Sequence, residues 1–131
     1  IGLIGPQGSG KTTIAQLIPR FYDVSRGRIT IDGQDIRDVS LESLRRHVAV
    51  VSQDVFMFTT TMENNIAYGD PWAPVPRIEG ASDHAQLHGY IDSLPERYRT
   101  VVGERGASLS GGQRQRMSIA RSLILTPAVL V

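Results

Sequence analysis

The sequence contains no cysteine, and Lys11 is the only lysine among its 14 basic residues. The lack of cysteine excludes a disulfide framework and any thiolate metal site. No apolar run approaches the roughly 20 residues of a membrane-spanning helix, and no basic start marks a signal peptide. The formal charge of only +1 over 131 residues lacks the basic field of a nucleic-acid-binding protein, so we expect no nucleic-acid partner.

Glycine, in contrast, is abundant and unevenly placed. Many of the 13 glycines gather in two clusters, around residues 5–10 and 103–112. Glycine clusters are typical of backbone that turns sharply or approaches a ligand closely. The two clusters are therefore the first candidates for binding sites.

The order of apolar runs and helical patterns predicts an α/β fold with a parallel-sheet core. Uninterrupted apolar runs, typical of strands buried on both faces, cover residues 1–4, 47–51 and 129–131. Helices are predicted over residues 12–21 (with a kink or end near Pro19), 40–46, 64–67, 77–93 (broken at Gly89) and 110–125. Because the first and last apolar runs reach the chain ends, we expect this chain to be a piece of a longer polypeptide.

Three local signals complete this outline. Residues 28–31 predict a strand that ends in a turn at Asp32–Gly33. Thr60 and Glu63 stand at the spacing of a capping box, and Ser40 is placed to cap the helix that follows it. Residues 70–76 hold three prolines, which indicates a surface loop.

Residues Gly5–Thr12 match the pattern G-x-x-x-x-G-K-[ST] between an apolar run and a helical pattern. Its glycines let successive N–H groups surround an anion, and the start of the helix adds a positive dipole. Lys11 would reach the β- and γ-phosphates, and the Thr12 hydroxyl would ligate Mg²⁺. The predicted nucleotide-binding residues are Gly5, Pro6, Gln7, Gly8, Ser9, Gly10, Lys11, Thr12 and Thr13. This loop alone does not choose among GTPases, kinases and ATPases.

The second glycine cluster contains Leu-Ser-Gly-Gly-Gln at residues 109–113. Ser110 is placed to cap a helix, so that Gly111 and Gly112 expose N–H groups at its positive end. Two phosphate-binding helix starts in one chain suggest that each contacts a different nucleotide. The alternative is an ordinary serine cap followed by flexible glycines.

With both motifs in this order, the sequence resembles the nucleotide-binding domain of ATP-binding cassette (ABC) transporters over essentially its whole length. Gly5–Thr12 matches the family's Walker A motif, residues 109–113 its signature motif, and Gln53 its Q-loop glutamine. The resemblance implies a P-loop NTPase fold, ATP and Mg²⁺ as cofactors, Lys11 and Gln53 as catalytic residues, and Thr12 and Gln53 as metal ligands. It also implies a second nucleotide-binding domain, in a homo- or heterodimer, whose ATP is covered in trans by Ser110, Gly111, Gly112 and Gln113.

Residues 43–46, 50–54, 65–69 and 100–106 look like the exporter branch of multidrug, lipid and peptide transporters. This likeness implies ATP hydrolysis that powers export, a transmembrane domain upstream in the same polypeptide, and a place at the cytoplasmic face of the plasma (inner) membrane. Phe56 and Phe58 follow Gln53 where exporters dock the membrane domain, and ordinary core burial is the open alternative. Residues 59–61 and 70–76 depart from the usual exporter pattern, which leaves the transported substrate open.

The resemblance divides the chain into a core subdomain, about residues 1–69 and 126–131, and a helical subdomain with the signature motif, about residues 70–125. The family's Walker B aspartate, catalytic glutamate and switch histidine would follow Val131. We therefore expect this chain by itself not to hydrolyse ATP at a useful rate. Arg114, Arg116 and Arg121 on the signature helix are expected to be solvated or packed on neighbouring acids.

Two alternative functions remain open at this stage. One is a soluble ABC ATPase of DNA repair or translation, without transport. The other is a degenerate half that binds nucleotide and does not hydrolyse it, against which the intact Lys11 and the complete signature motif argue.

Overall fold

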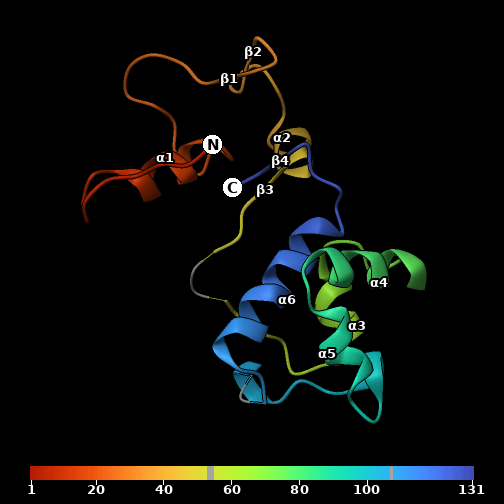
Figure 1. The fold of residues 1–131 in the computed structure, drawn as a ribbon. Helices are drawn as coiled ribbons and strands as arrows, with labels where there is room; N and C mark the ends of the chain where they lie inside the picture. Colours follow the sequence, from red (N-terminus) through yellow and green to blue (C-terminus); the bar gives the residue numbers. More distant parts are fainter. Residues whose placement is uncertain (53–54, 107) are drawn as a thin grey trace. The chain divides into compact units, whose positions relative to one another are not determined.

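The computed structural model describes residues 1–52, 55–106 and 108–131, and its contacts divide the chain into two compact units. The first unit comprises Ile1–Val50 and Pro127–Val131, and the second comprises Val51–Thr126 (Figure 1). Residues 51–52 and 55–69, predicted as part of the core subdomain, thus belong to the second unit. The assignment of the units as core and helical subdomains stays a prediction.

The first unit contains a short hairpin, two helices and a parallel strand pair (Figure 1). Strands β1 (Thr30–Ile31) and β2 (Gln34–Asp35) pair antiparallel through a turn in which Asp32 and Gly33 have φ values of 49° and 82°. Positive φ at both central positions is the requirement of a type I′ turn, so the predicted turn is confirmed. Strands β3 (Val48–Ala49) and β4 (Val129–Leu130) pair in parallel, which confirms the predicted parallel-sheet core.

The helices of the first unit follow their predicted start signals. Helix α1 (Lys11–Leu17) ends just before Pro19, which cannot continue a helix. Helix α2 (Leu41–His47) begins after Ser40, whose hydroxyl accepts a hydrogen bond from the Ser43 N–H at 3.2 Å. The small core of this unit consists of buried Ile36, Leu44 and Val48, with partly buried apolar residues around them.

The expected strand over residues 1–4 is wrong. This segment has no regular secondary structure, and Ile1 and Ile4 are fully exposed, at 126% and 100% of their reference areas. A strand requires a hydrogen-bonded neighbour, and in the described ranges β3 pairs with β4 alone. The apolar side chains of residues 1–4 favour burial, but a strand also requires hydrogen-bond partners for its backbone N–H and C=O groups.

The second unit is built around α6 (Gly111–Leu123), which packs against α3 (Met62–Ile66) and α4 (Val75–His84) (Figure 1). Helix α5 (His88–Asp92) follows α4, and short 3₁₀ turns form η1 (Ala67–Gly69), η2 (Arg97–Arg99) and η3 (Glu104–Gly106). The core of this unit is larger, and its fully buried side chains include Met57, Met62, Ile66, Leu87, Ile91, Met117 and Ile124. No helix in the described ranges is both long enough and apolar enough to span a bilayer.

Two predicted boundaries of the second unit are wrong by a few residues. Helix α3 is capped by Thr61, not Thr60, because the Thr60 carbonyl accepts a hydrogen bond from Val102 N–H at 2.8 Å and holds Thr60 outside the helix. The helical stretch predicted over residues 77–93 breaks before Leu87, whereas Gly89 lies inside α5. Gln86 turns the chain with a left-handed φ of 58°, so that Leu87 is completely buried.

The predicted loop over residues 70–76 is shorter than expected. Helix α4 already begins at Val75, with Pro74 as its N-cap and Pro76 in its first turn. Proline is well tolerated there, because the first N–H groups of a helix have no intrahelical acceptor. Trp72, the only tryptophan of the sequence, lies in this loop and is 92% exposed.

Candidate phosphate-binding site

The loop Gly5–Thr12 is closed on itself by the side chain of Lys11. The Lys11 Nζ donates hydrogen bonds to the carbonyl oxygens of Gly5 at 2.7 Å and Pro6 at 2.8 Å. It also donates to the Ser9 Oγ at 3.3 Å. An ammonium group has three N–H donors, so this loop engages all of them. The only lysine of the sequence is thus held at the centre of the predicted phosphate loop.

Glycines supply the backbone conformations that this loop requires. Gly8 and Gly10 have φ values of 80° and 88°, in the left-handed region that L side chains rarely adopt. Gly10 is the N-cap of α1, and no side chain caps that helix start. The first turn of α1 therefore carries N–H groups that a bound anion would satisfy.

Thr12 and Thr13 lie in the first turn of α1, and both are exposed. An exposed hydroxyl beside a phosphate loop fits Mg²⁺, which takes one or two protein oxygens together with phosphate oxygens and water. In the described ranges, no three His, Asp or Glu side chains are grouped to hold a metal by themselves. Gln53, the other predicted metal ligand, lies outside the described residues.

The second motif forms the start of α6. The Ser110 Oγ accepts a hydrogen bond from the Gln113 N–H at 3.2 Å, and the Gln113 Oε1 accepts one from the Ser110 N–H at 2.7 Å. These reciprocal bonds form a complete capping box. The prediction that Ser110 caps a helix is confirmed.

Gly111 and Gly112 supply the first N–H groups of this helix. Gly111 and Gly112 are exposed, and within the described part of the chain their N–H groups have no acceptor. Leu109 is buried at 4% exposure, and its carbonyl accepts a hydrogen bond from Arg114 Nη1 at 2.6 Å. The motif therefore combines a buried leucine, held by Arg114, with two exposed glycines.

Arg121 is a residue whose role sequence reasoning missed. It was expected to be solvated or paired with an acid, whereas it is half-buried and donates hydrogen bonds to the Phe56 and Asn65 carbonyl oxygens at 2.9 and 3.0 Å. The guanidinium carbon also lies 5.3 Å from the ring centre of Phe58 and 5.7 Å from that of Tyr68. The only signal for these contacts in the sequence is the presence of aromatic residues at positions 56, 58 and 68.

The two phenylalanines that follow Gln53 have different environments. Phe56 is 62% exposed, so core burial is excluded for it. Phe58 is half-buried between Phe56, with ring centres 5.1 Å apart, and Tyr68, with ring centres 4.4 Å apart. We call Phe56, Phe58 and Tyr68 the aromatic surface of the second unit.

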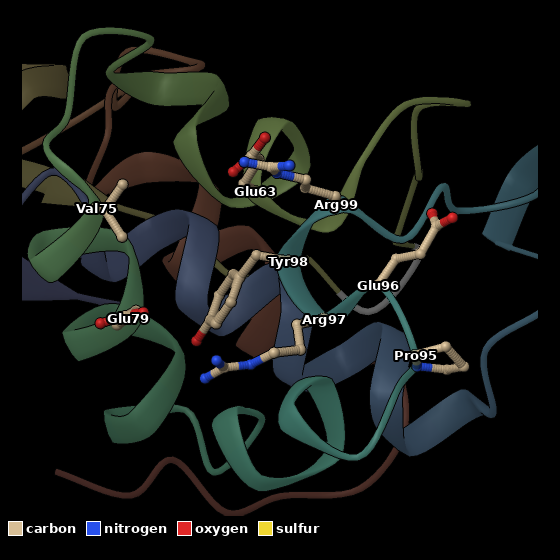
Figure 2. Close-up of a pocket in the computed structure, with 8 residues that line it drawn as sticks. All are labelled: Glu63, Val75, Glu79, Pro95, Glu96, Arg97, Tyr98 and Arg99. Atoms are coloured by element: carbon tan, nitrogen blue, oxygen red, sulfur yellow. The ribbon is translucent and has the colours of Figure 1, made fainter.

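A hollow of about 670 Å³ on the second unit is not the predicted site (Figure 2). Its lining side chains come from α3, α4 and residues 95–99, and they mix three glutamates with two arginines. The Tyr98 hydroxyl forms a short hydrogen bond with Ser82 Oγ and lies 2.8 Å from His88 Nδ1. These contacts hold the Tyr98 side chain in place at the edge of the hollow. None of the predicted nucleotide-binding residues lines the hollow.

Comparison with known proteins gives matches over the full length of the chain. The family described as ABC transporter matches residues 1–131. The ATP-dependent lipid A-core flippase of Syntrophus aciditrophicus (strain SB) is 51% identical over 131 residues, which are 100% of this chain and 22% of that protein. ATP-binding cassette sub-family B member 6 of Homo sapiens is 48% identical over 131 residues, 100% of this chain and 16% of that protein.

A solved structure gives the same result for the fold. The structure of a bacterial Atm1-family ABC exporter with ATP bound matches with a TM-score of 0.89 and 48% sequence identity. The match covers 95% of this chain and 22% of that chain. The P-loop NTPase fold expected from the sequence is therefore confirmed, and the chain spans less than a quarter of the length of the proteins it matches.

Proposed function

Since this chain belongs to the ABC transporter family, we propose that it binds MgATP and, within a full-length dimer, hydrolyses it to power export of a substrate across a membrane. The observation that carries the proposal is that both phosphate-binding motifs are complete. Gly5–Thr12 and Leu109–Gln113 each stand at the start of a helix. The reported relatives include a lipid flippase and a solved exporter, which favours export over a soluble, non-transporting ATPase.

Lys11 is the residue that we propose to contact the β- and γ-phosphates. Of its three hydrogen bonds, the one to Ser9 Oγ is the longest, at 3.3 Å, and therefore the one most easily exchanged for a phosphate oxygen. The bonds to the Gly5 and Pro6 carbonyls can persist and keep the ammonium at its place. Lys11 would then stabilise charge on the transferring phosphoryl group without moving far.

We assign Mg²⁺ to the Thr12 hydroxyl and to Gln53. The ion would neutralise negative charge on the phosphate oxygens. Residues Gly5–Gly10 and Thr13 would surround the phosphates through backbone N–H groups and hydroxyls.

The signature helix start is proposed to act on the ATP of a second nucleotide-binding domain. The open N–H groups of Gly111 and Gly112, and the Ser110 and Gln113 side chains, would cover the γ-phosphate in trans. The partner domain, identical or different, would complete the mirrored site. Closure of the two nucleotide-binding domains on ATP would change the conformation of the membrane domains, and hydrolysis would let them return.

The aromatic surface is the proposed contact with the transmembrane domain, which would precede this chain in the same polypeptide. Phe56 and Tyr68 are 62% and 59% exposed, and exposed aromatic side chains are enriched at protein interfaces. This arrangement would place the chain at the cytoplasmic face of the membrane.

The experiment uses the full-length protein in lipid nanodiscs. Subunits with Lys11→Ala and subunits with Gln113→Glu, carrying different affinity tags, are co-expressed, and the hybrid dimer is isolated through both tags. If each ATP site is formed by both subunits, the hybrid contains one intact site. That site combines Lys11 of the Gln113→Glu subunit with Gln113 of the Lys11→Ala subunit. The hybrid should therefore bind one MgATP, whereas the two parent dimers bind it at least tenfold more weakly.

Two outcomes would contradict the proposal. Wild-type protein that binds no MgATP would exclude nucleotide binding at Gly5–Thr12. A hybrid that binds no better than its parents would place both motifs of one site in the same subunit. Co-expressed subunits that never form a hybrid would contradict pairing of two identical chains. The same two substitutions would then be tested on the two different chains of a heterodimer, and absence of any dimer would contradict the proposal.

A further inference from the structure

Arg121 has an unusual environment for a half-buried cation. In the described ranges it forms no salt bridge, although charged groups withdrawn from water are normally paired with an opposite charge. Its planar group is instead surrounded by two carbonyl oxygens, one side-chain amide oxygen and two aromatic rings. Burial lowers the pKa of Arg121 from its ordinary value. These contacts suit the planar guanidinium, whose donors have a fixed geometry that a lysine ammonium does not reproduce.

Asn65 is the second part of this arrangement. It is completely buried, and its Oδ1 accepts hydrogen bonds from the Phe58 N–H at 3.0 Å and from Arg121 Nη2 at 2.9 Å. Its Nδ2 donates to the carbonyl oxygens of Phe58 at 3.0 Å and Thr61 at 3.1 Å. The backbone of residues 56–61 is therefore held by two side chains, one from α3 and one from α6.

A separate contact connects the same segment to the signature motif. The buried Met57 side chain lies so close to Gly106 that a Cβ at Gly106 would come within 2.9 Å of Met57 Cγ and 3.1 Å of Arg114 Cδ. Gly106 accepts a hydrogen bond from the Leu109 N–H at 2.9 Å, and Arg114 donates to the Leu109 carbonyl. The segment thus contacts α6 near Arg121 and also the loop that precedes Ser110.

We propose that Arg121 and Asn65 are positioning residues that fix the aromatic surface to the signature helix, so that the two move as one body. Arg121 contacts neither nucleotide nor membrane domain in this arrangement, and it acts through Phe56, Phe58 and Tyr68. This inference rests on the proposed function, in which the aromatic surface meets the membrane domain and Ser110–Gln113 meets ATP. Arg121 would then determine how strongly ATP binding at Ser110–Gln113 affects the aromatic surface, without changing the affinity for ATP.

The test is amide hydrogen exchange on the full-length protein with the substitution Arg121→Lys. Lysine keeps the charge but cannot bond to three oxygens in one plane while stacking on two rings. Peptides covering residues 55–61 should exchange about tenfold faster in the variant, since exchange reports local opening. Peptides covering α5, around the buried Ile91, should be unchanged.

Arg116→Lys is the matched control. Arg116 lies on the same helix, is exposed, and donates one hydrogen bond, to the Gln86 carbonyl at 3.0 Å. This variant should exchange like the wild type. Equal exchange of residues 55–61 in both variants would overturn the proposal. A uniform increase that includes α5 would overturn it too, because Arg121 would then only support overall stability.

Transmission is measured by adding MgATP to the same samples. In the wild type, ATP should slow exchange at residues 5–13, 109–113 and 55–61. In Arg121→Lys, the first two regions should remain protected with an unchanged ATP concentration dependence, while protection at 55–61 is lost. Protection that persists at 55–61 would overturn the proposal.

A failure of the proposed function would give a different pattern of hydrogen exchange. Wild-type protein with no ATP protection at residues 5–13 or 109–113 would contradict nucleotide binding, and the positioning proposal would then be decided by the nucleotide-free exchange alone. If Arg121→Lys does not fold, Tyr68→Leu serves as the second variant, because Tyr68 is 59% exposed and supplies one of the two stacked rings. It should raise exchange at 55–61 about threefold, and an unchanged rate would overturn the proposal.

Discussion

The two motifs proposed to bind phosphate begin their helices in different ways. At α1 the N-cap is Gly10, with a left-handed φ of 88° and no side-chain cap, and the loop before it is held by Lys11. At α6 the N-cap is Ser110, with both bonds of a capping box in place. The loop before α1 is thus stabilised by the charged Lys11 side chain, which a bound phosphate would also contact. The start of α6 is stabilised by neutral hydrogen bonds, which a bound phosphate would leave intact.

This difference shows where ligand binding requires rearrangement. Phosphate bound at Gly5–Thr12 would replace at least one bond of Lys11, since all three of its donors are engaged. Among the described residues, the N–H groups of Gly111 and Gly112 have no acceptor, so Ser110–Gln113 could receive a phosphate without breaking its cap. We therefore expect the first motif to rearrange when nucleotide binds and the second to be preformed.

The largest effect is expected from Lys11→Ala. The substitution removes the cation that holds the loop and that would contact the phosphates, so ATP hydrolysis by the full-length protein should fall about 100-fold or more. Phosphate release in nanodiscs measures this. Arg26→Ala is the control, because it removes an equal charge from an exposed position of the same unit, and it should stay within about twofold of the wild type. Similar losses in both variants would mean that net charge, not the loop, is responsible.

The next effect is expected from Gln113→Glu. Glutamate at this position preserves the capping box and favours the helix start, adding up to about 1 kcal/mol of helix stability. Its charge would face the γ-phosphate of the partner's ATP, and repulsion of about 2–4 kcal/mol corresponds to a loss of ATP affinity of more than tenfold. Calorimetric ATP titration and thermal unfolding measure the two effects. Unchanged ATP affinity would separate the signature motif from the nucleotide.

A smaller effect compares Ser110→Ala with Ser40→Ala. Both serines accept a hydrogen bond from the N–H three residues later at 3.2 Å, so each substitution should destabilise its own helix by about 1 kcal/mol. Amide exchange of α6 and α2, respectively, should rise about fivefold. ATP affinity should fall only in Ser110→Ala, by a few-fold. An equal effect of both substitutions on ATP would reduce Ser110 to an ordinary cap.

The last comparison, of Gly10→Ala with Gly112→Ala, concerns the stability of the two helix starts alone. No atom lies within 4 Å of a Cβ added at either glycine, so only backbone conformation distinguishes them. Alanine at Gly10 must adopt a left-handed φ and should destabilise the start of α1 by roughly 1–2 kcal/mol. Alanine at Gly112 lies in a regular helix and should stabilise α6 by about 0.5–1 kcal/mol. Opposite shifts in the exchange of the two helices would confirm this contrast, and shifts of the same sign would contradict it.

The parts of the fold that the sequence predicted correctly depend on local chemistry. The turn at Asp32–Gly33 and the caps at Ser40 and Ser110 each follow from bonds or φ values within a few residues. Strands β3 and β4 lie in two of the three predicted apolar runs and pair in parallel as expected, but which run would pair with which was not predicted.

The features that sequence reasoning missed depend on distant partners. The cap of α3 is Thr61 because Val102 binds the Thr60 carbonyl, and that contact spans residues far apart in the chain. The segment of residues 1–4 lacks the partner that its composition suggested. Arg121 looked like an ordinary helix-surface cation, since nothing near it in sequence announces the carbonyl groups of Phe56 and Asn65.

In the part of the chain that the structure describes, the groups that accept hydrogen bonds from Arg121 are uncharged, and this has one more consequence. Amide and carbonyl groups neither gain nor lose protons, so the hydrogen bonds between α6 and residues 56–65 contain no carboxylate that acid could switch off. A salt bridge in the same place would weaken as its acid became protonated. The attachment of the aromatic surface to the signature helix should therefore hold equally well when the acidity of the surrounding solution changes.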